Sequence, residues 1–147
     1  MVAEGALIEH ACYVGNYYGT PKAYVDQKLT EGFDVILEIE IQGALQVKRS
    51  FPDACLVFIS TPDAQTLRER LIKRGTESPE VIDSRLARAV EEASGIGFYD
   101  YFVINDDLMT CVEQIHGIVT SEHMKTSRNQ KLIEHISSDM KKFEKGR

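Results

Sequence analysis

The sequence of 147 residues contains no tryptophan, only three cysteines and no long apolar segment. Its longest purely apolar run, residues 54–59, is much shorter than the roughly 20 residues that a helix needs to cross a bilayer. The first residues lack the basic and apolar regions of a signal peptide. Cys12, Cys55 and Cys111 lie far apart and form no C-x-x-C pair. We therefore expect reduced thiols in a cytoplasmic protein that does not contact a membrane.

Several motifs of catalysis and binding are also absent. None of the ten glycines is followed by lysine, so there is no phosphate-binding loop of the G-x-x-x-x-G-K-[ST] type. Gly95 and Gly97 are followed by Asp100 instead of a third glycine, which excludes a dinucleotide-binding fingerprint. The four histidines and three cysteines have no metal-ligand spacing, and no serine or cysteine lies in a nucleophile elbow. We expect no metal site built from these side chains.

The composition is that of an ordinary globular domain. Hydrophobic residues make up 43% of the chain and charged residues 27%, which is enough for a core. The chain has 17 Lys and Arg against 23 Asp and Glu, a net charge of −6. Proteins that track a nucleic-acid backbone usually carry a basic stripe, so the charge argues against a nucleic-acid partner.

Short apolar runs alternate with helical patterns along the chain. Asp63 is expected to cap a helix, Pro79 suits a first helical turn, and Gly75 is expected to end a helix. A small helical stretch is expected near the start, and an amphipathic helix from about residue 108, followed by a loosely held extension. Strands followed by helices predict a parallel α/β sheet. The predicted strands are residues 33–39, 54–60 and 101–105, and the predicted helices between and around them are residues 21–31, 42–50, 63–74 and 79–94.

Two acidic side chains, Glu38 and Glu40, stand at the carboxyl end of the first predicted strand. Ligands of open parallel sheets bind beyond the carboxyl ends of the strands, so these carboxylates are candidates for a site. The alternative interpretation is that both simply end a strand in solvent.

Arginines are concentrated over residues 68–88, which hold six basic and four acidic residues in a chain of net charge −6. Arg70 and Arg74 are four residues apart on one predicted helix, and Arg85 and Arg88 three apart on the next. Guanidinium groups bind phosphate oxygens bidentately, so the two helices could clamp an anion. A solvated helical face with internal salt bridges is an equal alternative.

A third candidate is the glycine-bracketed segment of residues 15–21, which is expected to be a turn carrying Tyr18 and Thr20. Its hydroxyls could contact a ligand, or its tyrosines could cap a small core. Upstream, Glu9 is expected on a short helix, where a single acid is normally surface decoration.

Five motifs, taken in order, resemble those of the guanylate kinase family. The resemblance runs from residue 1 to about residue 125. The motifs are Gly15-Asn16-Tyr17-Tyr18-Gly19-Thr20-Pro21, Ile39-Glu40-x-Gln42-Gly43-Ala44, Phe51-Pro52-Asp53-Ala54, Arg70-Leu71-x-x-Arg74-Gly75-Thr76-Glu77 and Val103-Ile104-Asn105-Asp106-Asp107-Leu108.

The resemblance implies transfer of the γ-phosphoryl group of Mg-ATP to GMP. For the GMP side, it implies that Glu9 and Glu40 recognise guanine, Tyr18 contacts the phosphate and Thr20 contacts the base. The family usually has Asp at the position of Glu40. On the ATP side, it implies that Arg74 and Arg85 are lid arginines and that Arg70 is a further catalytic arginine near the nucleotide. It also implies that Asn105 lies near the ATP base. The alternative for Asn105 is that it only ends a strand and turns the chain.

The implied fold is a P-loop nucleoside-monophosphate-kinase-like parallel sheet with helices. The family's first strand and its phosphate loop, which holds most of the Mg-ATP contacts, have no counterpart in these residues. The implied divisions are residues 1–32 for the remainder of the GMP-binding domain, 33–66 and 96–125 for the core, 67–95 for the lid and 126–147 for a C-terminal helical extension.

Two expectations follow from the absence of the family's first strand and phosphate loop. This chain alone should not turn over, and an uncovered strand edge should lead to a homodimer or to low stability. The alternative to an enzyme is a non-catalytic guanylate-kinase-like module that binds protein partners.

Overall fold

The computed structural model describes residues 6–13, 16–75 and 77–144. Gly15 and Thr76, which belong to two of the motifs above, lie outside the described residues. The elements are β1 (Leu7–Tyr13), β2 (Asn16–Pro21), α1 (Lys22–Thr30), α2 (Ile41–Ser50), β3 (Val57–Ser60), α3 (Ala64–Arg74), α4 (Pro79–Ala93), the 3₁₀ turn η1 (Ile96–Phe98), β4 (Tyr101–Ile104), α5 (Leu108–His123), the 3₁₀ turn η2 (Thr126–Arg128) and α6 (Gln130–Lys141).

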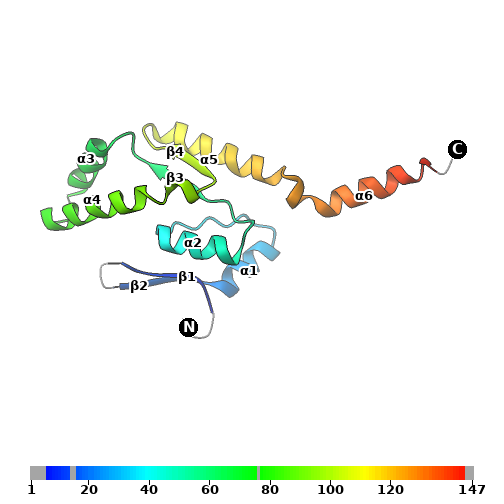
Figure 1. Ribbon diagram of the computed structural model, residues 1–147, viewed down its shortest axis with the longest axis horizontal. Coiled ribbons are helices and arrows are strands. Elements are labelled where there is room, and N and C mark those ends of the chain that lie inside the picture. Colours follow the sequence, from blue (N-terminus) through cyan, green and yellow to red (C-terminus); the bar gives the residue numbers. More distant parts are fainter. Residues whose placement is uncertain (1–5, 14–15, 76, 145–147) are drawn as a thin grey trace.

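Two small sheets organise the chain. Strands β3 and β4 pair in parallel with Val57 opposite Tyr101, and α3, α4 and η1 form the connection between them. This pair confirms two of the three predicted strands and their parallel arrangement. Strands β1 and β2 form a separate antiparallel hairpin, on which α1 and α2 lie (Figure 1).

The hairpin corrects two predictions. Residues 7–10 were expected on a short helix and residues 15–21 in a turn, but residues 7–13 and 16–21 are paired strands, with His10 opposite Gly19. A helix of one turn is costly to nucleate, whereas pairing satisfies the backbone groups of both segments at once. The predicted turn is therefore one strand of a ladder.

The prediction of a strand at residues 33–39 is wrong. The segment is not hydrogen-bonded into either sheet among the described residues. Val35, Leu37 and Ile39 pack against the core cluster, whereas Ile36 is 80% exposed. The apolar run therefore alternates between core and solvent, and is not buried on both faces as a central strand would be.

The helices follow the predicted signals closely. The Asp63 carboxylate accepts a hydrogen bond from the Thr66 N–H at the start of α3, and Pro79 occupies the first turn of α4. Gly75 ends α3 with φ of 65°, a left-handed conformation that disfavours residues with a Cβ. None of the helices among the described residues combines the length and the apolar character needed to span a membrane.

The core lies where α1 and α2 meet the hairpin. Ile8, Val25 and Val47 form its buried centre, one from each of β1, α1 and α2. By contrast, α6 buries no side chain and projects away from the other elements (Figure 1). The packing of Ile8 against Val25 and Val47 holds the hairpin, α1 and α2 together, so the positions of the side chains around Glu9 are fixed.

Candidate functional site

The first group of candidate residues meets on the hairpin. Glu9 on β1 lies opposite Thr20 on β2, and the Thr20 hydroxyl donates a hydrogen bond of 2.7 Å to Glu9 Oε1. Glu9 is only 4% exposed. A register shift between Leu7 and Glu9 marks an irregularity in β1, a feature that re-aims side chains near sites. Glu9 is therefore a buried and oriented carboxylate rather than surface decoration.

Tyr18 belongs to the same face of the hairpin. Residues two apart on a strand point to the same side, which places Tyr18 alongside Thr20. Tyr18 is 57% exposed, so its phenol is open to solvent. The hairpin can thus present a buried acceptor, a hydroxyl and an exposed phenol to one ligand.

Helix α2 crosses the hairpin next to Glu9. The Gln46 side chain accepts a hydrogen bond of 3.2 Å from the His10 N–H and donates one of 3.0 Å to the His10 carbonyl, so it pairs with β1 as a strand would. Gly43, one turn earlier, faces the Glu9 carboxylate, since a Cβ built on Gly43 would lie 2.7 Å from Glu9 Oε2. Sequence reasoning missed both roles, although a glycine inside a helical pattern often has a packing reason.

Glu40 lies at the start of α2 but faces a different element. Its Oε2 is 3.5 Å from Arg88 Nη2 on α4, and Glu92 Oε1 is also 3.5 Å from the Arg88 guanidinium. Burial first, and then the hydrogen bond with Glu40, raise the pKa of Glu92. The described contacts of Glu40 thus connect α2 to α4 and do not bring it to the Glu9–Thr20 pair.

The candidate arginines divide between two places. The Arg70 guanidinium donates hydrogen bonds to the Asn105 carbonyl at 2.6 Å and to the Asp106 carbonyl at 3.4 Å, so it joins α3 to the end of β4. Arg70 and Asn105 are thereby brought together. Arg85 forms an ion pair of 2.5 Å with Glu77, and Arg74 is exposed at the last turn of α3. These two arginines lie around the connection between α3 and α4.

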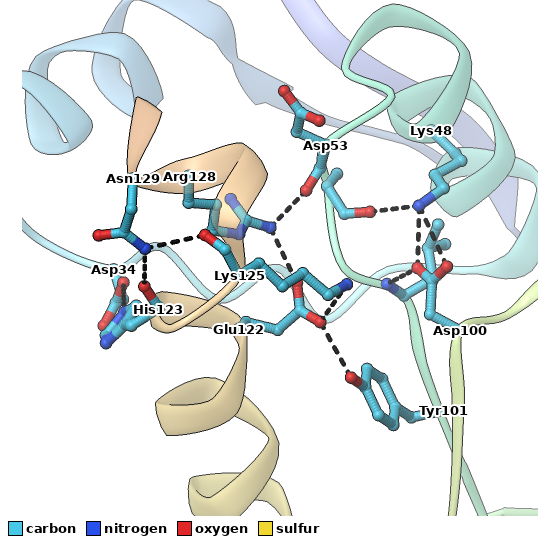
Figure 2. A network of polar contacts seen from close by, with 12 residues as sticks. Asp34, Lys48, Asp53, Asp100, Tyr101, Glu122, His123, Lys125, Arg128 and Asn129 are labelled. Carbon is cyan, nitrogen blue, oxygen red and sulfur yellow. Dashed lines mark hydrogen bonds and ion pairs between the residues drawn. The ribbon is translucent and has the colours of Figure 1, made fainter. Parts of the chain in front are cut away.

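A second polar cluster centres on Glu122 at the end of α5. We call this group of side chains, shown in Figure 2, the Glu122 cluster: Lys48, Asp100, Tyr101, Glu122, Lys125 and Arg128. A small cavity of about 90 Å³ opens beside it and is lined in part by Cys55. Burial raises the pKa of the Cys55 thiol, and the nearby carboxylates of Glu122 and Asp100 raise it further. The thiol is therefore protonated at neutral pH and is a weak nucleophile.

The charges of the Glu122 cluster satisfy one another. Asp100 accepts hydrogen bonds from the Leu56 N–H at 2.8 Å and from Lys48 at 2.9 Å, and its pKa is lowered because these bonds outweigh burial. Arg128 also donates to the Asp53 carbonyl. The cluster thus ties α2, the residue before β3, β4, α5 and η2 together, which is a structural role. In the part of the chain that the structure describes, no group of three or more His, Cys, Asp or Glu side chains could hold a metal ion.

Comparison with known proteins agrees with these observations. The family model for guanylate kinase matches residues 1–122. The chain is 49% identical over 141 residues to a guanylate kinase of Lactococcus lactis, covering 96% of the chain and 69% of that protein. It is 48% identical over 128 residues to one of Streptococcus agalactiae, covering 87% of the chain and 61% of that protein.

The fold is similar to that of a solved family member as well. The crystal structure of guanylate kinase from Anaplasma phagocytophilum superimposes with a TM-score of 0.71 at 30% sequence identity, over 86% of this chain and 61% of that one. The predicted class, an α/β fold of the P-loop nucleoside monophosphate kinase type, is confirmed. The chain spans 61–69% of the length of these relatives. On the evidence of its motifs, its fold and its relatives, the chain belongs to the guanylate kinase family.

Proposed function

We propose that this chain is the GMP-recognising and lid-bearing part of a kinase that transfers the γ-phosphoryl group of Mg-ATP to GMP and releases ADP and GDP. The observation that carries the proposal is the buried Glu9 carboxylate, oriented by Thr20. Guanine presents its N1–H and 2-amino donors side by side, and one carboxylate can accept both. Adenine has no such pair, so a preformed carboxylate selects guanine.

The other GMP contacts are assigned around this carboxylate. Thr20 holds Glu9 and borders the base, and the exposed Tyr18 on the same face donates its hydroxyl to the GMP phosphate. Glu40 is bound by Arg88 in this structure. We assign it to guanine recognition after α4 moves, which would release its carboxylate toward the hairpin.

The arginines are assigned to the phosphates. Two of them, Arg74 and Arg85, lie around the connection between α3 and α4, and they would close over the transferred phosphoryl group and offset its charge. Arg70 would lie on the ATP side, next to Asn105. Phosphoryl transfer depends mainly on positioning and electrostatic stabilisation, which these groups can supply. Mg²⁺ enters as part of the Mg-ATP substrate.

Guanine recognition is tested by titrating the chain with GMP and AMP in a calorimeter. GMP is expected to bind and AMP is not, and Glu9→Gln should abolish the preference because an amide N–H₂ would then face the guanine donors. Glu134→Gln, which changes an exposed carboxylate on α6, is the matched control and should leave GMP binding unchanged. Equal affinity for GMP and AMP would contradict the assignment, and binding of a protein partner without nucleotide would favour a non-catalytic module.

Catalytic turnover needs a phosphate-binding loop in addition to guanine recognition, and the sequence of 147 residues contains no glycine-rich phosphate-loop motif with its lysine. We propose that this chain alone does not catalyse the reaction. In a coupled assay with GMP and Mg-ATP, ADP formation is expected to stay at the no-enzyme level. ADP production that requires both the chain and GMP would contradict this.

We also propose that two copies associate through residues 33–39. This segment is not paired into a sheet among the described residues, and Ile36 is 80% exposed. Backbone groups that no strand pairs can bond to another chain, as those of an edge strand do. Sedimentation should show a homodimer that Ile36→Lys dissociates. A monomer of high thermal stability would contradict the proposal.

A further inference from the structure

Helix α2 approaches the Glu9 carboxylate more closely than any residue with a side chain would allow. A Cβ added at Gly43 would lie 2.7 Å from Glu9 Oε2, 3.4 Å from its Cδ and 3.5 Å from its Cγ. A separation below 3.0 Å is essentially never seen for real Cβ atoms. Glu9 therefore occupies the space that a side chain at residue 43 would fill.

The helix cannot relieve this contact by moving away. One turn after Gly43, the Gln46 amide is hydrogen-bonded to both the N–H and the carbonyl of His10, the residue next to Glu9. Val47 on the same helix is part of the buried core. These two attachments fix the distance between α2 and β1, so any added atom at position 43 must displace the carboxylate.

We propose that Gly43 is a positioning residue that sets guanine specificity, because its missing side chain lets the Glu9 carboxylate stand where Thr20 can hold it. This inference rests on the proposed recognition of GMP by Glu9. The displaced atom would be the end of a flexible side chain, so Gly43→Ala should fold, while the Glu9 carboxylate turns away from Thr20 and from the base.

Gly117 provides the matched control. It lies within helix α5, as Gly43 lies within α2, and a Cβ there would meet nothing within 4 Å. Both variants replace a glycine inside a helix by alanine, which has the higher helix propensity. Any difference between them in ligand binding therefore reports the contact with Glu9 rather than the loss of a glycine.

The test is calorimetric titration of the wild type and its variants with GMP, and with IMP, which lacks the 2-amino group. Loss of one charge-assisted hydrogen bond corresponds to about a ten- to hundredfold loss of affinity. Gly43→Ala is expected to lose GMP affinity by this factor and IMP affinity by less, while Gly117→Ala binds both as the wild type does. Unchanged GMP binding by Gly43→Ala would overturn the proposal.

A double variant separates steric displacement from general damage. Glu9→Asp withdraws the carboxylate from position 43 by one methylene, so adding Gly43→Ala to it should cause no further loss of GMP affinity. If Gly43→Ala causes the same loss with and without the Glu9→Asp substitution, Gly43 acts independently of the carboxylate, which rejects the proposal.

A crystal structure of nucleotide-free Gly43→Ala supplies a readout that needs no ligand. The bond from Thr20 Oγ1 to Glu9 Oε1, 2.7 Å in the wild type, should be broken. If it is intact, Gly43 does not position the carboxylate and the proposal fails. If it is broken but the wild type binds no GMP, the specificity role falls together with the proposed function, whereas the positioning of Glu9 by Gly43 stands.

Discussion

Replacing Glu122 by glutamine removes the negative charge on which three donors converge. Glu122 is 6% exposed, and its Oε1 lies 2.6 Å from Lys125 Nζ and 3.0 Å from the Tyr101 hydroxyl. Its Oε2 lies 3.1 Å from Arg128 Nη2 (Figure 2). Because Arg128 also reaches the Asp53 carbonyl, the carboxylate connects the end of α5 to the loop after α2.

These contacts determine how much the charge contributes to stability. The hydrogen bond from Lys125 is the largest influence, and with those from Arg128 and Tyr101 it outweighs burial and lowers the pKa of Glu122 from 4.5 to about 2. A shift of that size corresponds to about 3 kcal/mol. Lys125 is half exposed and Arg128 one third exposed, so screening by solvent reduces the expected contribution to about 1–2 kcal/mol.

The sign of the pH dependence follows from the lowered pKa. The unfolded chain binds the proton more tightly than the folded chain does, so ionised Glu122 stabilises the fold fully above about pH 4.5. This contribution is lost as the pH falls from there toward about 2. Glutamine does not titrate, so Glu122→Gln should lose about 1–2 kcal/mol at pH 7 and progressively less in acid.

Urea unfolding at a series of pH values from 7 to 3 measures this difference. Glu113→Gln, an exposed position on the same helix, is the control for a general effect of net charge. The free-energy gap between the wild type and Glu122→Gln should narrow below pH 4.5, whereas the gap for Glu113→Gln should stay small throughout. A gap for Glu122→Gln that is constant from pH 7 to pH 3 would refute the argument.

Three further predictions concern the helices. Burial and a neighbouring carboxylate raise the pKa of Glu92, so the wild type should gain stability relative to Glu92→Gln as the pH falls from neutral toward 4.5, which thermal unfolding can follow. Asp63→Ala should cost about 1 kcal/mol in urea titrations, because Asp63 caps α3, and Ser78→Ala, at a cap without such a bond, should cost less. In a longer chain with a phosphate-binding loop, Arg74→Ala and Arg85→Ala should lower kcat with the unfolding midpoint preserved; an unchanged kcat in either would refute the lid assignment.

Local signals predicted the helices and the parallel pair of strands. The cap at Asp63, the first-turn Pro79 and the left-handed Gly75 act within a few residues of where they stand, so the sequence alone locates the ends of α3 and the start of α4. The apolar runs before α3 and before α5 likewise correspond to β3 and β4. The order of five short motifs was sufficient to identify the family.

The same kind of signal failed for the hairpin and for residues 33–39. An isolated Glu9 in an apolar stretch is equally compatible with a surface helix, and only the pairing of β1 with β2 places it opposite Thr20. In residues 33–39, β-branched residues predicted a strand, but a strand also needs a hydrogen-bonded neighbour. Sequence propensity does not say whether that neighbour is present.

The sequence by itself determined the family, the ends of α3 and the start of α4, and it showed which acidic, hydroxyl and arginine side chains the chain carries. The tertiary structure decided which of those residues meet: Glu9 with Thr20 under Gly43, Glu40 with Arg88, and Arg70 with the Asn105 carbonyl. The physical reason is the distance along the chain over which each kind of interaction acts. Capping and helical periodicity depend on neighbours within about four residues, whereas the burial of a carboxylate depends on the packing of segments that are distant in the chain.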